Sequence, residues 1–413
     1  MEQRGDAFEI EGLAGERVLE GELAVRGSKN AALPALAAGL LFDTPPLLEN
    51  VPDIADVRVM REMLAAPEIA RGELPAELAE KMRASVIIAG PLLARVGSAR
   101  FPHPGGCVIG ERPINFFLEG FARMGVQVEI HEGAYCLTAP QGGLRGTDIF
   151  FPFPSVTSTE TLMLTAVRAQ GTTVLRNAAM EPEVVFLAEL LRQGGARISG
   201  EGTPTITIQG GTVPLFAPRH PLRVIPDRIE TASFLILAAL LGKEIAITEC
   251  EPEHARCVIE LLEQSGATLV VEKRRIIVRA SKQTNVSVSV KTHEYPGFPT
   301  DAQAPWAVFL TQAEGQGLIH ETIFEGRLAY TADLVAMGAD ITLYDAHRAA
   351  VRGPTPLRGR ELYGPDLRAG LAYVIAALVA EGPSVIHNAH YIDRGHEALE
   401  TRLAALGARI KRV

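Results

Sequence analysis

One phrase recurs along this chain: an apolar strand, a polar step, an amphipathic helix and then a glycine that leads into another strand. The glycines that end these helices are spaced by 70, 71, 72 and 69 residues, at Gly125, Gly195, Gly266, Gly338 and Gly407. A period of about 70 residues indicates one supersecondary unit used several times. Each unit also contains a second helix that is apolar nearly all round, as in TASFLILAALLG, and such a helix is typically buried.

Two helices per unit, one buried and one amphipathic, predict small sheets packed around an inner set of helices. We therefore expect an α/β fold of β-α-β-α-β-β units that close into two lobes of three. The first unit is expected to be shortened, because its second helix runs into AAPEIARGELPAEL without the usual strand pair. Chain crossings near residues 27–28 and 226–227 predict one lobe at 29–227, a second at 1–28 plus 228–413, and an active site in the cleft between them.

Charge and composition exclude several classes of function. A net charge of −9 opposes non-specific nucleic-acid binding, which depends on a basic surface. The longest apolar stretches are shorter than the roughly 20 residues of a membrane span, so we expect a cytoplasmic protein that contacts neither nucleic acid nor membrane. Four cysteines without a C-x-x-C pair argue against a disulfide framework or a zinc cluster. Nucleotide-binding glycine motifs are missing as well, and we expect no metal and no cofactor.

Polar residues gather at the N-termini of the buried helices. A helix N-terminus favours anions, so cations placed there oppose the helix dipole unless an anion lies among them. The pattern therefore predicts a site for phosphate or carboxylate. In the alternative interpretation the hydroxyl residues are N-caps, at Ser28, Ser85, Thr159 and Thr300, and the arginines are exposed or paired with Asp227 or Asp366. The residues aligned by the repeat at these helix starts are Ser28 to Asn30, Arg83 to Ser85, Ser155 to Thr159, Asp227, Arg228, Thr300, Asp301 and Asp366 to Arg368.

Several long phrases resemble the enolpyruvyl transferases, in particular the branch that acts in peptidoglycan synthesis. They run through nearly the whole chain in the family's order: RGSKNAALP, KMRASVIIAGPLLAR, PGGCVIGERPI, PDRIETASF, FPTDAQA, GPDLRAG and YIDRGHE. The resemblance implies two lobes built from inverse α/β barrels. It also implies transfer of the enolpyruvyl group of phosphoenolpyruvate to the 3-hydroxyl of UDP-N-acetylglucosamine, with release of phosphate, as the first committed step of peptidoglycan precursor synthesis.

The resemblance assigns roles residue by residue. It implies that Cys107 protonates or adds to the enolpyruvyl carbon, that Asp301 accepts the proton of the sugar hydroxyl, and that Lys29 and Arg394 hold anionic groups. For Asp301 the alternative is an N-cap. For Cys107 the alternative is a small buried hydrophobe, which we also expect for Cys136, Cys250 and Cys257. The residues implied to bind the substrates are Asn30, Arg83, Arg112, Pro113, Ile114, Asn115, Phe116, Ser155, Val156, Arg228, Ile323, Asp366 and Arg368.

The chain departs from the family pattern where the nucleotide is expected to bind. Asn115 and Phe117 replace an acidic residue and a histidine, and Pro154 and Thr157 stand where lysine and glycine are common. Two alternatives therefore stay open: an enolpyruvyl transferase for another nucleoside or nucleotide acceptor, and a catalytically silent binding homologue. Retention of Asn30, Asp301 and Ile323 favours the amino sugar. The phrase PGGCVIG favours the UDP-sugar branch over the shikimate branch.

Overall fold

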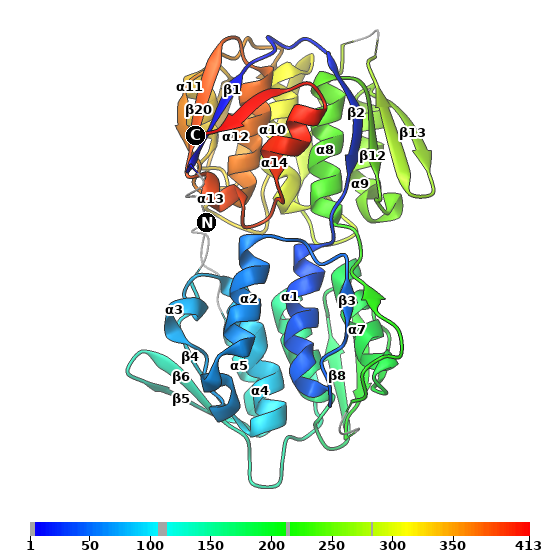
Figure 1. Ribbon diagram of the computed structural model, residues 1–413, viewed down its shortest axis with the longest axis vertical. Helices are drawn as coiled ribbons and strands as arrows, with labels where there is room; N and C mark the ends of the chain where they lie inside the picture. The colour runs from blue at the N-terminus through cyan, green and yellow to red at the C-terminus, as the bar shows by residue number, and fades with distance from the viewer. Residues whose placement is uncertain (1–4, 106–113, 212–214, 282–283) are drawn as a thin grey trace. The chain divides into compact units, whose positions relative to one another are not determined.

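The computed structural model describes residues 5–105, 114–211, 215–281 and 284–413 (Figure 1). These residues form two compact units. Unit 1 comprises residues 5–26 and 226–413, and unit 2 comprises residues 27–105 and 114–225. In the described ranges no helix combines the length and the apolar character that a membrane span requires.

Three inner helices form the centre of unit 1 and pack against one another (Figure 1). They are α8 (Arg228–Leu241), α10 (Gln303–Gln312) and α12 (Leu367–Val379). All residues of α12 are buried, and so are all of α8 after Arg228. This burial confirms the prediction made from helices that are apolar nearly all round. The outer helices of unit 1 are α9 (Arg256–Gln264), α11 (Thr331–Met337) and α14 (Leu399–Ala405).

Three four-stranded sheets accompany these helices. Their strand orders are β13-β14-β12-β2, β15-β16-β18-β17 and β19-β20-β1-β21. Each sheet has one parallel pair and two antiparallel pairs. The strands are β1 (Ala7–Glu11), β2 (Leu19–Ala24), β12 (Gly242–Thr248), β13 (Thr268–Glu272), β14 (Arg275–Arg279), β15 (Val290–Lys291), β16 (Gly315–His320), β17 (Asp340–Leu343), β18 (Arg348–Gly353), β19 (Glu361–Tyr363), β20 (Pro383–His387) and β21 (Arg409–Arg412).

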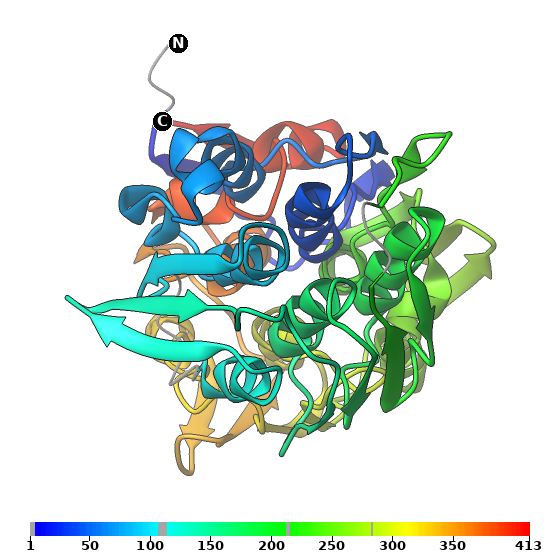
Figure 2. The same cartoon turned by 90° about the horizontal axis from the view of Figure 1, so that it is seen from below.

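Unit 2 has the same general plan, and its inner helices are seen end-on in Figure 2. They are α1 (Lys29–Ala38), η3 (Arg83–Ile88) continuing as α4 (Ala89–Val96), and α6 (Val156–Ala166). The outer helices are α2 (Ala55–Ala65), α5 (Asn115–Arg123) and α7 (Pro182–Gln193). The three sheets have the orders β7-β8-β10-β9, β4-β6-β5 and β11-β3. Their strands are β3 (Leu48–Glu49), β4 (Ser98–Pro102), β5 (Gln127–His131), β6 (Ala134–Thr138), β7 (Asp148–Phe150), β8 (Thr172–Arg176), β9 (Arg197–Ser199), β10 (Thr205–Gln209) and β11 (Leu222–Arg223).

The sheet that accompanies α1 and α2 is the smallest. Among the described residues it has the two-residue strands β3 and β11 alone, which pair in parallel although 173 residues separate Leu48 from its partner at 222. After α2 the chain forms the short helices η2 (Pro67–Arg71) and α3 (Ala76–Ala79), where the other sequence repeats have a strand pair.

The helix-ending glycines have the backbone conformation that the repeat predicts. Each follows an outer helix with φ between 91° and 113°, at Gly125, Gly195, Gly266, Gly338 and Gly407. A left-handed residue at this position ends a helix, and glycine adopts it without a Cβ penalty. The repeat therefore fixed the ends of these five outer helices correctly.

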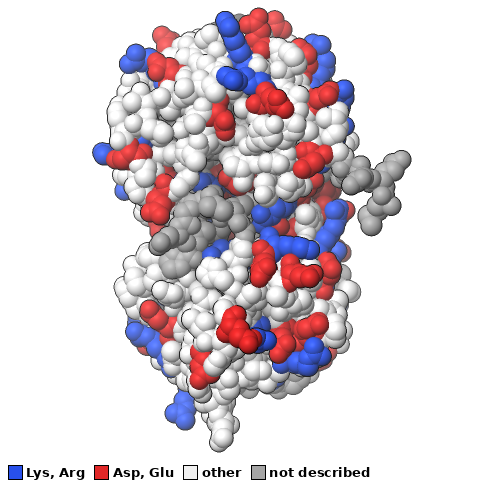
Figure 3. Space-filling model, turned by 90° about the vertical axis from the view of Figure 1, so that its left-hand side faces the viewer, with Lys and Arg blue, Asp and Glu red and all other residues white. Residues whose placement is uncertain are grey.

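Acidic and basic side chains are interspersed on the face shown in Figure 3. Several exposed pairs link neighbouring strands, such as Lys243 with Glu20 at 2.6 Å and Arg279 with Glu244 at 2.8 Å. Exposed pairs of this kind contribute little to stability. Their effect is to mix the signs of charge over the surface.

Candidate active site

The starts of the inner helices in unit 1 carry the predicted residues. Asp227 caps α8, with its Oδ1 accepting from two backbone N–H groups of the first turn at 2.8 and 3.0 Å. Asp366 caps α12 in the same way, at 2.7 and 3.1 Å. Arg228 is the first residue of α8 and Arg368 is the second residue of α12. The prediction of cations at these helix starts is confirmed.

Asp301 lies in η5 (Thr300–Ala302), directly before α10, between two buried guanidinium groups. Its Oδ1 accepts a hydrogen bond from Arg327 Nη2 at 2.6 Å, and its Oδ2 lies 3.1 Å from Arg368 Nη2. The two arginine side chains are 5% and 6% exposed, whereas Asp301 is 25% exposed. The carboxylate is thus the accessible member of an Arg–Asp–Arg cluster.

The charge state of this cluster follows from its neighbours. Burial acts to raise the pKa of Asp301, but Arg368, Arg327 and Arg228 outweigh that effect and hold the pKa well below its usual range. Burial likewise acts to lower the pKa of Arg368, and the carboxylates of Asp301, Asp227 and Asp366 reverse it. Asp301 is therefore ionised at neutral pH and can accept a hydrogen bond from a hydroxyl. The guanidinium groups have the geometry that suits carboxylate and phosphate.

The competing N-cap interpretation is wrong for Thr300 and for Asp301. Pro299 precedes η5 and makes no capping bond, and the Thr300 hydroxyl instead donates to Glu321 Oε2 at 2.8 Å. The suggested pairing of the arginines with a helix cap also needs correction for Arg368, because its closest carboxylate partner is Asp301. Arg368 thus pairs with a carboxylate on a neighbouring helix and not with Asp366 on its own turn.

Two further N-cap assignments in unit 2 are wrong, and two residues there do cap helices. The Ser85 hydroxyl lies inside η3 and donates to the carbonyl of Ala79 at 3.0 Å. Thr159 lies inside α6 and accepts from the backbone of Ala179 at 3.1 Å. The observed caps are Ser28 on α1 and Ser155 on α6, each accepting a backbone N–H at 3.3 Å. In a run of hydroxyl residues, sequence alone did not show which one begins the helix.

Lys29 is the first residue of α1 and forms an ion pair within unit 2. Its Nζ lies 2.5 Å from Asp56 Oδ2, in the first turn of α2, and both side chains are largely buried. Asn30 follows on α1 and is half-buried. The ammonium group of Lys29 is thereby held in one place while part of its surface stays accessible. Arg83, half-buried, is the first residue of η3, as the repeat predicts.

The residues expected near the nucleotide lie at the starts of α5 and α6. Asn115 is the exposed first residue of α5, and the buried Ile114 precedes it. The ring of Phe116 meets that of Phe153 edge to face, with 4.5 Å between centroids, and Phe153 is 48% exposed. Phe117, where the family pattern has histidine, packs in the core against Phe121. Val156 begins α6 directly after Ser155.

Ile323 and Arg394 lie on loops of unit 1. The backbone N–H of Ile323 donates to Glu321 Oε1 at 2.8 Å, which fixes the loop after β16. Arg394, half-buried, follows α13 (Ala389–Ile392). The residue before it, Asp393, pairs with Arg412 Nη2 at 2.5 Å and so holds this turn against β21. The remaining predicted residues, Cys107, Arg112 and Pro113, lie outside the described residues.

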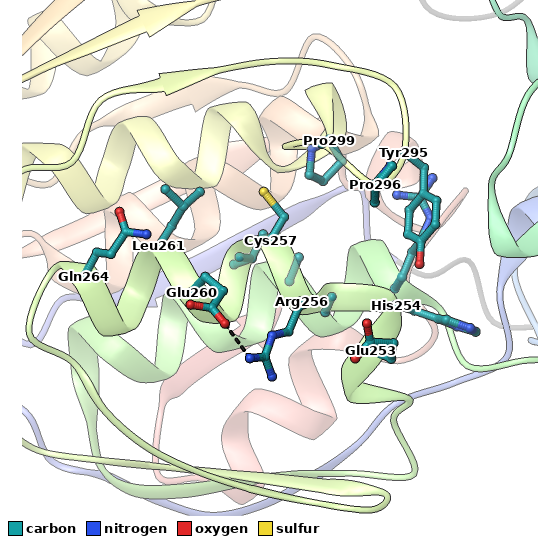
Figure 4. Close-up of a pocket in the computed structure, with 15 residues that line it drawn as sticks. Glu253, His254, Arg256, Cys257, Glu260, Leu261, Gln264, Tyr295, Pro296 and Pro299 are labelled. Carbon is teal, nitrogen blue, oxygen red and sulfur yellow. Dashed lines mark ion pairs between the residues drawn. The ribbon is translucent and has the colours of Figure 1, made fainter.

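A cavity of about 380 Å³ opens in unit 1 beside α9 (Figure 4). The segment 295–299, which leads into Thr300 and Asp301, forms one wall, and Arg228 lies 5.6 Å from the ring centroid of Tyr295. Of the described candidate residues only Arg228 lines this cavity. Cys257 also lines it, and burial raises the pKa of that thiol, so Cys257 is a poor nucleophile.

The two histidines of the H-x-x-H spacing contact different carboxylates. His387 Nε2 lies 2.7 Å from Glu361, and His390 Nδ1 lies 2.8 Å from Asp6. In the part of the chain that the structure describes, no group of three or more His, Cys, Asp or Glu residues is arranged to hold a metal ion.

Sequence reasoning missed three residues of this region: Arg327, Glu321 and Asp56. Arg327 and Glu321 lie within GLIHETIFEGRLAY, but on the loop between a strand and an outer helix rather than at the start of a buried helix. Asp56 lies in the first turn of an outer helix. A search of all helix starts, not only the buried ones, would have found Asp56.

Comparison with known proteins identifies the chain as an enolpyruvyl transferase. The family model of EPSP synthase (3-phosphoshikimate 1-carboxyvinyltransferase) matches residues 13–403, so the chain belongs to that family. Within it, the chain belongs with the UDP-N-acetylglucosamine 1-carboxyvinyltransferases: it is 44% identical to the one from Desulforapulum autotrophicum, over 99% of this chain and 100% of that protein.

Solved structures agree on the fold. The enolpyruvyl transferase NikO from Streptomyces tendae has a TM-score of 0.86 at 26% identity, covering 99% of both chains. The EPSP synthase from Acinetobacter baumannii has a TM-score of 0.73 at 20% identity, covering 98% of this chain and 99% of that one. The second likeness concerns the fold alone.

Proposed function

We propose that this protein transfers the enolpyruvyl group of phosphoenolpyruvate to the 3-hydroxyl of UDP-N-acetylglucosamine and releases phosphate, in the cytoplasm, as the first committed step of peptidoglycan precursor synthesis. Relatives named for this activity, 44% identical over nearly the whole chain, support it. We further propose that each unit is an inverse α/β barrel of three repeats, the first one shortened. Both substrates are anionic, as the cations at the helix starts require.

The observation that carries the proposal is the ionised Asp301 between Arg327 and Arg368. A carboxylate that is partly accessible and hydrogen-bonded by guanidinium groups suits a base that must face a sugar hydroxyl beside an anionic co-substrate. A silent homologue would have no need to keep a charged carboxylate accessible among buried arginines, because burying three charges is costly.

The reaction is an addition followed by an elimination. Asp301 takes the proton of the sugar hydroxyl while the hydroxyl oxygen forms a bond to C2 of phosphoenolpyruvate. In the same step Cys107 or a neighbouring group gives a proton to C3. The bond between C2 and the phosphate oxygen then breaks, C3 loses a proton, and the enolpyruvyl ether forms. Lys29, Arg83, Arg112, Arg228, Arg368 and Arg394 hold the carboxylate and phosphate groups, which stabilises the developing negative charge.

Binding of the anionic co-substrate also activates the base. While Asp301 is held by both arginines its proton affinity is low. An anion that draws hydrogen bonds from the same guanidinium groups raises the pKa of Asp301 towards its usual range, because the cations then compensate two negative groups. The base thus gains basicity when phosphoenolpyruvate is in place.

The test measures phosphate release from phosphoenolpyruvate with UDP-N-acetylglucosamine as acceptor, in wild type, Asp301→Ala and Asp301→Asn. We expect release by the wild type and a loss of kcat of about 100-fold or more in both variants, the usual contribution of a positioned base. Asp345→Asn, at an exposed site of unit 1, is the matched control and should keep wild-type activity.

A panel of other nucleosides and nucleotides in the same assay tests the acceptor. Phosphate release only with another acceptor would change the assigned acceptor substrate. Asn115 and the Phe116–Phe153 pair are the positions at which a different acceptor would be recognised. No release with any acceptor would favour the catalytically silent homologue.

A further inference from the structure

Glu321 is a buried carboxylate to which the proposed reaction gives no role. It follows β16 directly, and none of its surface is exposed. Its Oε1 accepts hydrogen bonds from Thr292 Oγ1 at 3.0 Å and from two backbone N–H groups at 2.8 and 3.1 Å. Its Oε2 accepts from Thr300 Oγ1 at 2.8 Å. All four partners are donors, which matches the acceptor oxygens of a carboxylate side chain.

One of these bonds fixes the turn that carries Asp301. Thr300 and Asp301 are neighbours in η5, and the Thr300 hydroxyl reaches Glu321 across 21 residues of sequence. The hydroxyl makes no capping bond within its own turn. The position of the Asp301 backbone therefore depends on a side chain from another element.

The two backbone bonds fix the loop that leads to the partner of Asp301. They come from Ile323 and Phe324, at the start of the segment that reaches Arg327. The Arg327 guanidinium lies 5.9 Å from the ring centroid of Phe324 and donates to Asp301 at 2.6 Å. The Glu321 carboxylate thus fixes both the turn that carries Asp301 and the loop that leads to Arg327.

We propose that Glu321 is a positioning residue that sets the geometry of Asp301 against Arg327 and holds the Ile323 backbone beside the sugar. This inference rests on the proposed function of Asp301 and deepens it. Misplacement of a reacting group by about 1 Å can cost roughly 100-fold in rate. Replacing Glu321 by alanine removes the acceptor of all four hydrogen bonds, whereas a glutamine keeps one acceptor oxygen and can donate its NH₂ group to the Thr300 hydroxyl.

Two substitutions at Thr300 isolate the bond to the Asp301 turn. Thr300→Val removes the hydroxyl at nearly constant volume, and Thr300→Ser keeps it. We expect Thr300→Val to lower kcat by roughly 10- to 100-fold with a smaller change in KM, and Thr300→Ser to restore most of the activity. Glu321→Ala should lower kcat further, because it also removes the acceptor of the Ile323 and Phe324 N–H groups.

The matched control is Thr311→Val, which removes a buried hydroxyl from α10 that donates to Val308 at 2.7 Å and does not contact Asp301. It should lose stability comparable to Thr300→Val and keep wild-type kcat. Equal losses of kcat in the two valine variants would mean that the loss of any buried hydroxyl lowers kcat, and this result would overturn the inference. A wild-type kcat in Thr300→Val would overturn it as well.

A crystal structure of Thr300→Val tests the inference without turnover. We expect the Asp301–Arg327 contact to lengthen or break, and an unchanged contact contradicts the positioning role. Failure of the proposed function can be told apart from failure of this inference. If the proposed function is wrong, the wild type itself releases no phosphate. The crystal structures of wild type and Thr300→Val then still show whether Glu321 positions Asp301.

Discussion

At the scale of single residues, Asp301 and Lys29 follow the same principle. Each is held by an oppositely charged side chain from another element, Asp301 by Arg327 and Lys29 by Asp56. Each partner is nearly fully buried, while the held group keeps part of its surface exposed. The partner fixes the group in place and leaves part of its surface accessible.

Replacing Arg327 by glutamine should raise the pKa of Asp301, because one of the cations that depress it is removed. A base with a raised pKa becomes protonated at a higher pH, so the acid limb of the kcat/KM profile should move to higher pH by about 1 unit or more. Phosphate release measured across pH gives this profile. Arg352→Gln, at an exposed arginine of β18, is the control and should leave the limb in place. An unmoved limb in Arg327→Gln would show that Asp301 is not the titrating base.

The sequence predicted which residue types stand at the starts of the inner helices, but not their partners. Arg327 lies 26 residues from Asp301, and Asp56 lies 27 residues from Lys29, on elements that the repeat does not align with them. Such pairs are formed by tertiary packing. A single sequence indicates which residues begin a helix, but it does not indicate which residues of other elements contact them.

At the scale of elements, the apolar inner helices and the glycines after the outer helices were predictable because each has a local cause. The two-residue strands β3 and β11 were not predictable, since a strand of that length shows no alternation of apolar and polar residues. The N-cap assignments failed for Ser85, Thr159 and Thr300 because these hydroxyls bond to other elements instead.

Two of the helix-ending glycines differ in their surroundings and allow a paired test. A Cβ at Gly407 would meet nothing within 4 Å, whereas a Cβ at Gly338 would lie 2.8 Å from the carbonyl oxygen of Pro356. Gly407→Ala should therefore cost only the strain of a left-handed alanine, about 1 to 2 kcal/mol, and Gly338→Ala should cost more. Urea unfolding followed by the fluorescence of Trp306, the single and buried tryptophan, reports on unit 1 for both variants. Equal losses would contradict the role given to Pro356.

At the scale of the whole molecule, unit 1 is assembled from distant parts of the sequence. Glu230 on α8 accepts the backbone N–H of Arg26 at 2.9 Å and a hydrogen bond from Arg402 Nη1 at 2.7 Å. The Asp227 N–H donates to the carbonyl of Arg26 at 2.9 Å. The segment that leaves unit 1 and the segment that returns to it are thereby tied to the same helix start.

Glu230 should make the stability of unit 1 depend on pH in the acid range. Burial acts to raise the pKa of Glu230, but Arg402 and His396 outweigh it and lower the pKa from 4.5 to about 2. The folded form therefore gains stability above pH 4.5 that is lost as the pH falls towards 2. Glu230→Gln should cost about 3 to 5 kcal/mol at neutral pH, because Arg402 is left without its charge partner.

The measurement is urea unfolding by Trp306 fluorescence at a series of pH values. The difference between wild type and Glu230→Gln should shrink below pH 4.5. Glu244→Gln removes an exposed pair with Arg279 and serves as the control, with little effect at any pH. A difference that stays constant with pH would mean that Glu230 keeps the same pKa when the chain unfolds.

The strand pairing also sets the order in which the molecule becomes complete during synthesis. Every strand of unit 2 has its partners once residue 223 has left the ribosome, whereas β1 waits for β20 and β21, at residues 383–387 and 409–412. Domains generally fold as units while the chain is still being made. Unit 2 can thus fold before unit 1 is complete, whereas β1 has neither of its partner strands until residues 383–387 and 409–412 have been made.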